Sequence, residues 1–326
     1  MAEYKAIRGH TIRTIDGDAS PLVAGDIWYN SSSKKIRGAK LVAAWATGGT
    51  MNVARTQSQA IGTQTAAIAF SGRPPENDHK ACETFDGSSW TEVGDTNTQR
   101  GGCGASGQTN TAALCIGGLD GTVSPSIKLN VEKWNGTSWT EVGDINTGRF
   151  QIGCFGTNTA AIAAAGDSYP STPTNAVESW DGSSWTETTE VNTNRGQHSG
   201  ASAGATNTAG LIFAGDPNSV EEWNGSAWTE IADMNTLKKG SCGAGTNTAA
   251  LCMGAVAPTP VVGYVEEWNG TSWAETADLA VSRGDHSGTG TSTAALVLGG
   301  GAGAPGKLNT TETYTNAVTA SSFTSS

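Results

Sequence analysis

A glutamate placed two residues before an aromatic residue recurs six times along this chain of 326 residues. Consecutive copies are 43 to 49 residues apart. A repeat of that length indicates stacked supersecondary units, each of which buries its apolar faces against its neighbours. The repeated glutamates are Glu83, Glu132, Glu178, Glu221, Glu266 and Glu312.

Each unit can be divided into four short strands separated by turn residues. A Gly-rich segment is followed by a TAA segment, then by V-E-x-W and finally by a segment that begins with Trp, as in SSWTE. The six units predict an all-β, six-bladed β-propeller over residues 41–326. Asn-Gly and Asp-Gly pairs between the third and fourth strands predict two-residue hairpins with type I′ turns. These pairs are Asp86-Gly87, Asn135-Gly136, Asp181-Gly182, Asn224-Gly225 and Asn269-Gly270.

A second regularity predicts how the ring closes. The fourth-strand Trp is followed after ten positions by a basic residue, and the same interval occurs before the first full unit at Trp45–Arg55. The last unit ends in TTETYT and has no following Trp. Residues 41–55 are therefore expected to supply the fourth strand of the last blade, which removes open sheet edges. Residues 1–40 are expected to form a short β extension, and the tail 316–326 is left without a place.

Eleven Trp residues stand beside only 5 Tyr and 6 Phe. Most of them flank the turn between the third and fourth strands, as Trp134 and Trp139 do. A carbohydrate-stacking platform and packing between blades both use such rings. Their regular repetition favours packing between blades.

Charge is distributed unevenly along the chain. Residues 1–40 contain seven Lys or Arg and four Asp or Glu, a net of +3, so the remainder of a chain with net charge −11 carries −14. An acidic body argues against nucleic-acid binding, because contacts with phosphate need basic surfaces. A basic extension on an acidic body indicates two surfaces with different roles.

The repeated string R-x-x-(Gly-rich)-TAALxxGG-loop-VExW-NG-xxW-T resembles the kelch repeat, although the Gly pair is complete only at Gly117-Gly118 and Gly299-Gly300. The segments WNGTSWTEVGDINT and GTNTAAL are similar to those of kelch-like virion or tail proteins of marine tailed bacteriophages. GDIWYNSSSKKIRG, at 25–38, resembles short segments of phage tail and virion proteins. The resemblance implies a virion component.

Candidate catalytic groups are few and scattered. The histidines are His10, His79, His198 and His286, and the last two occupy equivalent repeat positions. The copper site of kelch-fold oxidases needs His and Tyr ligands together, which the sequence does not offer. The six cysteines contain no C-x-x-C and are interpreted as small buried residues. We expect no catalytic residues, no metal and no cofactor.

The repeated Glu and the basic residue ten positions after Trp form a candidate pair in each unit. The basic residues are Arg55, Arg100, Arg149, Arg195 and Arg283, with Lys238 in the fifth unit. Buried ion pairs that hold the blades in register are the favoured interpretation, and a ring of carboxylates around a cation is the alternative.

The connections between the second and third strands differ in every unit, whereas the other turns are short and uniform. A uniform scaffold with one variable face is typical of a binding platform. Candidate residues on these loops are Arg73, Asp120, Asp167, Tyr169, Asp216 and Tyr264.

Together these patterns favour a non-enzymatic virion protein, associated with the tail or a fibre. It would dock on other virion proteins through residues 1–40, and its loop face would bind a protein, a host-surface glycan or another receptor. Capsid decoration, a free glycan-binding propeller and a kelch-fold carbohydrate-active enzyme are the alternatives. No apolar segment reaches the length of a membrane span and no signal peptide is evident, so synthesis in the host cytoplasm is expected. The symmetry of a virion implies several copies per particle.

Overall fold

A computed structural model describes residues 12–73, 80–120, 127–168, 170–196, 202–215, 218–257, 259–301 and 306–322. These residues form strands and turns, with no helix among them, and therefore none that is long and apolar enough to cross a membrane. The chain folds into two compact units. The larger unit spans Trp45–Tyr314, and the smaller one joins the residues up to Ala44 with those from Thr315 onward.

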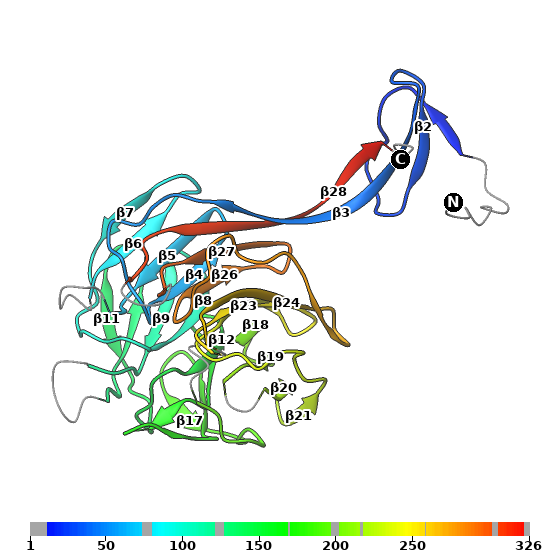
Figure 1. Ribbon diagram of the computed structural model, residues 1–326. Helices are drawn as coiled ribbons and strands as arrows, with labels where there is room; N and C mark the ends of the chain where they lie inside the picture. The colour runs from blue at the N-terminus through cyan, green and yellow to red at the C-terminus, as the bar shows by residue number, and fades with distance from the viewer. Residues whose placement is uncertain are drawn as a thin grey trace. The chain divides into compact units, whose positions relative to one another are not determined.

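The larger unit consists of repeated four-stranded antiparallel sheets (Figure 1). The first strands are β4 (Gln59–Thr63), β8 (Gly104–Thr109), β12 (Gly153–Gly156), β18 (Ser202–Thr206), β22 (Cys242–Thr246) and β26 (Ser287–Gly290). The second strands are β5 (Ala66–Phe70), β9 (Ala112–Ile116), β13 (Ala161–Ala164), β19 (Ala209–Ile212), β23 (Ala249–Ala255) and β27 (Ala294–Leu298). The third strands are β6 (Cys82–Phe85), β10 (Val131–Trp134), β16 (Val177–Trp180), β20 (Val220–Trp223), β24 (Val262–Trp268) and β28 (Thr311–Ser322).

The fourth strands of five sheets are β7 (Trp90–Val93), β11 (Trp139–Val142), β17 (Trp185–Glu187), β21 (Trp228–Ile231) and β25 (Trp273–Glu275). In the remaining sheet the order is β1-β2-β3-β28-β27-β26, so β28 lies next to β3 (Lys35–Thr47). Here β1 is Arg13–Ile15 and β2 is Ile27–Asn30, and a further short hairpin joins β14 (Asp167–Ser168) to β15 (Thr172–Pro173). Residues 316–322 of the tail that the sequence left without a place thus form the end of a long strand.

The first strands of successive sheets are neighbours. β4 contacts β8, β8 contacts β12, and the series continues through β18 and β22 to β26, which in turn contacts β4. These strands are rich in Gly and Ala, which lets their backbones approach closely. The fold is therefore all-β and propeller-like, with each sheet turning its first strand toward those of its neighbours.

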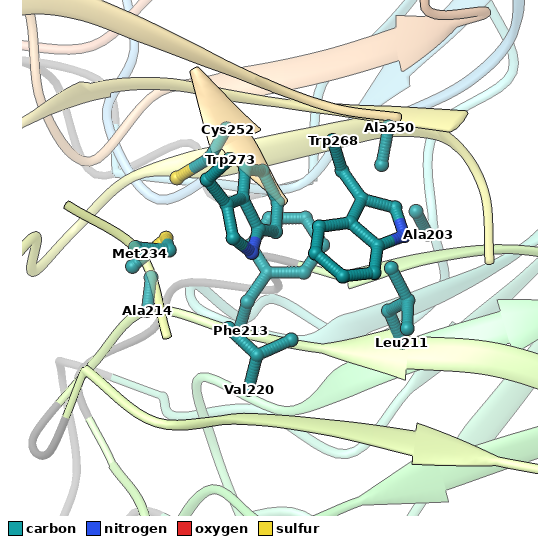
Figure 2. Close-up of a cluster of buried hydrophobic side chains, with 10 residues drawn as sticks. All are labelled: Ala203, Leu211, Phe213, Ala214, Val220, Met234, Ala250, Cys252, Trp268 and Trp273. Atoms are coloured by element: carbon teal, nitrogen blue, oxygen red, sulfur yellow. The ribbon is translucent and has the colours of Figure 1, made fainter. Parts of the chain in front are cut away.

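Tryptophan packs the sheets against each other. Figure 2 shows Trp268 and Trp273 of one sheet packed on Leu211 and Phe213 of the preceding one. The equivalent rings Trp180 and Trp185 form the same kind of cluster. Ten of the eleven Trp residues are buried and Trp45 is half-buried. The rings therefore form the core, and they do not provide the exposed platform that carbohydrate stacking needs.

The type I′ prediction for the hairpins between third and fourth strands is wrong. Trp134 pairs with Trp139, so the connection has four residues, and among them only Gly136 has a positive φ, of 94°. The Asn135 Oδ1 accepts the backbone N–H groups of Thr137 and Ser138, each at 2.9 Å. This side-chain cap closes a wider loop than the dipeptide alone would suggest.

Gly62, on the first strand β4, is sterically restricted. At Gly62 the φ is 128°, and a Cβ atom would lie 2.2 Å from the Ala66 carbonyl oxygen. Gly62→Ala is expected to lower the free energy of unfolding by about 2 kcal/mol, because both the clash and the φ disfavour a side chain. Urea denaturation measures this loss. Gly306→Ala is the matched control, since nothing lies within 4 Å of the added Cβ, and equal stability of the two variants would contradict the assignment.

Candidate functional site

The repeated acidic and basic residues form six buried ion pairs. In each pair a basic side chain lies on the segment that enters a first strand, and its Glu lies on the third strand of the same sheet. The N–O distances range from 2.5 to 3.2 Å. The pairs are Arg55–Glu83, Arg100–Glu132, Arg149–Glu178, Arg195–Glu221, Lys238–Glu266 and Arg283–Glu312.

Each glutamate also accepts hydrogen bonds from the segment that arrives from the preceding sheet. The Glu132 Oε2 accepts the backbone N–H of Asn97 at 2.6 Å and its side-chain Nδ2 at 2.9 Å, and Oε1 accepts the N–H of Thr98 at 3.0 Å. Arg100 donates in addition to the carbonyls of Gly117 and Asn130. The carboxylate thus fixes the connection between two sheets to the third strand of the second sheet.

The glutamates do not line a common cation site. Glu83, Glu132, Glu178 and Glu221 are fully buried, and each lies beside its own guanidinium. Burial lowers the pKa of Arg149, Arg195 and Arg283, while the neighbouring carboxylates oppose this shift. Within the described part of the chain, no group of three His, Cys, Asp or Glu residues has the geometry of a metal site.

A cavity of about 100 Å³ lies between the first strands. All six first strands contribute to its wall, mainly through backbone and small side chains. Hydroxyl groups bridge neighbouring strands here: Ser106 donates to the Thr157 carbonyl, Ser202 to Cys154 and Thr289 to Gly62. The lining holds no carboxylate, imidazole or amine, and burial raises the pKa of the Cys154 thiol to about 12. A few water molecules fit this volume.

Backbone hydrogen bonds link the sheets at the entry to the first strands. Gln57 N–H donates to the Asp285 carbonyl, Gly102 to Gln57, Gln151 to Gly102 and Asp285 to Gly240, at 2.5 to 2.8 Å. All five residues have left-handed φ values between 50° and 63°. Each occupies the second position after the paired Arg or Lys. The sequence gives one indication of this left-handed conformation, because two of the five positions are glycines, Gly102 and Gly240.

The candidate loop residues occupy different environments. Asp120 is buried and accepts from Lys128 at 3.2 Å and from Gln99 at 3.1 Å. Asp167 is also buried, on β14. Arg73 is half-buried, and its side chain lies against Gly101. Tyr169 and Asp216 lie outside the described residues. The two aspartates are therefore part of the scaffold and do not form an accessible binding group.

Tyr264 does not lie on a loop. It belongs to β24, which pairs with β23 as far as Ala255↔Val262, so this sheet extends further toward its connection than the others do. The sequence pattern placed Tyr264 on a loop because this connection differs from the equivalent ones in the other units. The Tyr264 ring is 48% exposed, and Leu237, on the segment that carries Lys238, is 40% exposed.

His286 is a buried, titratable side chain in the last sheet. It is 1% exposed, and neither ring nitrogen has a hydrogen-bond partner in the described part of the chain. Burial and the charge of Arg283 lower its pKa to about 3, and a contact with the Met253 backbone opposes the shift only in part. Of the other candidate histidines, His10, His79 and His198 lie outside the described residues.

Acidification is expected to destabilise the fold through His286. Because the folded pKa lies below the unfolded value of 6.5, the unfolded chain binds the proton more readily, and stability falls as the pH drops from 6.5 toward 3. Between pH 6.5 and about 4.5 the loss is about 2–3 kcal/mol. His286→Ser introduces the residue found at the equivalent positions Ser58 and Ser241. Urea denaturation across this range should show a flatter pH profile for the variant, and equal slopes would refute the role of His286.

Comparisons with known proteins inform the fold and not the chemistry. No protein-family model and no curated protein matches the chain. A solved structure titled "Structure of YjhT" is similar, with a TM-score of 0.68 at 13% sequence identity, over 84% of this chain and 99% of that one. At this identity the likeness supports the propeller-like arrangement of repeated sheets and nothing further.

Proposed function

We propose that the sheets are the six blades of a closed propeller, with β3 as the outer strand of the last blade. The contact of β26 with β4 and the order β3-β28-β27-β26 support this arrangement. Trp45 supports it as well. Its Nε1 donates to the carbonyl of Ala277, four residues after Trp273, just as Trp228 donates to Thr189, four residues after Trp185.

We further propose that the protein is a non-enzymatic virion component of a tailed phage, associated with the tail or a fibre. Residues 1–40 would dock on other virion proteins, and the propeller would display its loop face toward a protein, a host-surface glycan or another receptor. The observation that carries this proposal is the contrast within each sheet. The charged residues of the repeat are engaged in buried ion pairs. The connection between the second and third strands, by contrast, has a different sequence in each sheet.

Proteomics of purified virions tests the proposal. The chain should be present in several copies per particle, and gold-labelled antibodies should mark the tail or its fibres. Labelling spread over the head would favour capsid decoration instead. Absence of the chain from purified virions would overturn the virion role.

Exposed Tyr264 favours glycan binding as a second candidate function. Tyr264 is 48% exposed, so its aromatic ring offers a surface on which a sugar could stack. A glycan array probed with the wild type and with Tyr264→Ala tests this candidate. Binding that is lost in the variant supports it, and the absence of any bound glycan excludes it.

A further inference from the structure

The smaller unit has a thin core on one face of its sheet. Trp28 is 1% exposed and packs with Ala19 and Ala39. Ile15, Leu22, Val318 and Ala320 are only partly buried around them. The described residues of this unit number about forty, a size at which a fold seldom buries enough apolar surface alone. Contact with another protein surface would increase the apolar area that this unit buries.

The opposite face of the same sheet carries exposed apolar side chains. Tyr29 pairs with Ile36 and Ile27 with Gly38, so these residues alternate with Trp28 and point away from its core. Ile27 is 40% exposed, Ile36 is 43% exposed and Tyr29 is half-buried. We name the surface formed by Ile27, Tyr29 and Ile36 the isoleucine face.

Basic residues lie beside the isoleucine face. Lys40 shares this face, because it alternates along β3 with Ala39 of the Trp28 core, and Lys34 lies in the turn between β2 and β3; both are exposed. Arg13 and Lys35 pair with Trp28 and Asn30, so they point to the opposite face. The carboxylate of Asp18 is paired with Arg37 at 3.0 Å. The described residues of the unit carry five basic and three acidic side chains, a net of +2. Two copies packed through this face would bring like charges together, which disfavours self-association.

We propose that the isoleucine face docks on an acidic protein surface of the particle, with an apolar centre that covers Ile27 and Ile36. The lysines would pair with the acidic rim of that surface. This inference rests on the proposed virion function and names the partner chemistry of its attachment segment. Apolar contact in the centre and complementary charge at the edge match the usual anatomy of a protein interface.

A reconstitution experiment tests the proposal. Particles from a phage that lacks the gene are mixed with purified full-length protein and sedimented, and bound protein is quantified at low and high ionic strength. Ile36→Asp and the double change Lys34→Glu, Lys40→Glu should each weaken binding by about tenfold or more. Val23→Asp is the control, because Val23 is 58% exposed but lies in the segment between β1 and β2, outside the isoleucine face. Thermal melts establish that each variant is folded.

The outcomes separate this inference from the proposed function. Salt-sensitive binding that both variants lose, and the control retains, supports the docking surface. If the wild type binds and both variants bind equally well, the docking surface is wrong although the virion role stands. If the wild type does not bind and is absent from purified virions, the proposed function itself fails. A wild-type dimer that Ile36→Asp converts to a monomer would assign the face to a second copy and overturn the proposal.

Discussion

Replacing Arg100 by Met will lower the free energy of unfolding by about 3–5 kcal/mol, because the change leaves a buried carboxylate without its counter-ion. Arg100 and Glu132 are both fully buried, and their N–O distance is 2.6 Å. The same change removes the donors to the Gly117 and Asn130 carbonyls, which lie at 3.0 and 2.5 Å. Urea denaturation of the two proteins measures the difference.

The chain contains its own control for this prediction. Lys238 occupies the equivalent position in the fifth sheet and pairs with Glu266 at 3.2 Å. Arg100→Lys should therefore cost less than Arg100→Met, since the charge is kept and only guanidinium contacts with the carbonyls of Thr98, Gly117 and Asn130 are lost. The double change Arg100→Met, Glu132→Leu should recover part of the loss, because no charge stays buried. A negligible effect of Arg100→Met would show that the pair does not stabilise the fold.

The sheets and the residues of the ion pairs follow from the periodicity of the chain. A Glu on every third strand and a basic residue ten positions after Trp repeat because each sheet places the same groups in the same environment. Departures from the repeat do not change the backbone. Ser71, Ala165 and Ala214 replace the first Gly of the Gly pair that follows the second strand, yet they adopt φ values of 58°, 54° and 63°. Each accepts a left-handed conformation at a cost of about 1 kcal/mol.

Other features depend on contacts that a sequence pattern does not encode. The hairpins are wider than the Asn-Gly pairs predict, because Asn135 and its equivalents cap two N–H groups of their own loops. The strand that contains Tyr264 is extended by pairing with Ala255 and its neighbours. Buried Asp120 pairs with Lys128, which lies on the far side of the same connection. Local propensity carries no information about such partners.

The position of residues 316–322 also could not be predicted from the repeat pattern. AVTASSFTSS lacks the Trp and Arg of the repeat, so the repeat pattern offers it no position. In the structure β28 continues to Ser322, Arg37 donates to the Ala320 carbonyl at 3.4 Å, and Ser321 Oγ donates to that of Gly38 at 3.4 Å. Its partner is β3, which comes from the other end of the chain, and only the three-dimensional arrangement brings the two together.

Deletion of residues 1–47 is expected to have the largest effect on stability, with a loss of more than about 5 kcal/mol or of cooperative unfolding altogether. If β3 is the outer strand of the last blade, its removal exposes β28 and leaves Tyr314 without the Trp45 ring, 4.9 Å away. It also opens an unpaired sheet edge, which promotes aggregation. Thermal unfolding followed by circular dichroism, together with light scattering, measures both consequences.

Two matched variants distinguish ring closure from a general effect of truncation. Deletion of residues 1–34 keeps all of Lys35–Thr47 and should leave the larger unit folded. Trp45→Ala should lower the free energy of unfolding by about 2–4 kcal/mol, because the ring fills space between neighbouring sheets. Trp139→Ala, in a sheet whose four strands are consecutive in sequence, should have an effect of the same order. Trp45 is the more exposed of the two, which places its effect at the lower end of that range. If the deletion of 1–47 and Trp45→Ala both leave the unfolding transition unchanged, β3 does not close the last sheet, and the proposed role of β3 is wrong.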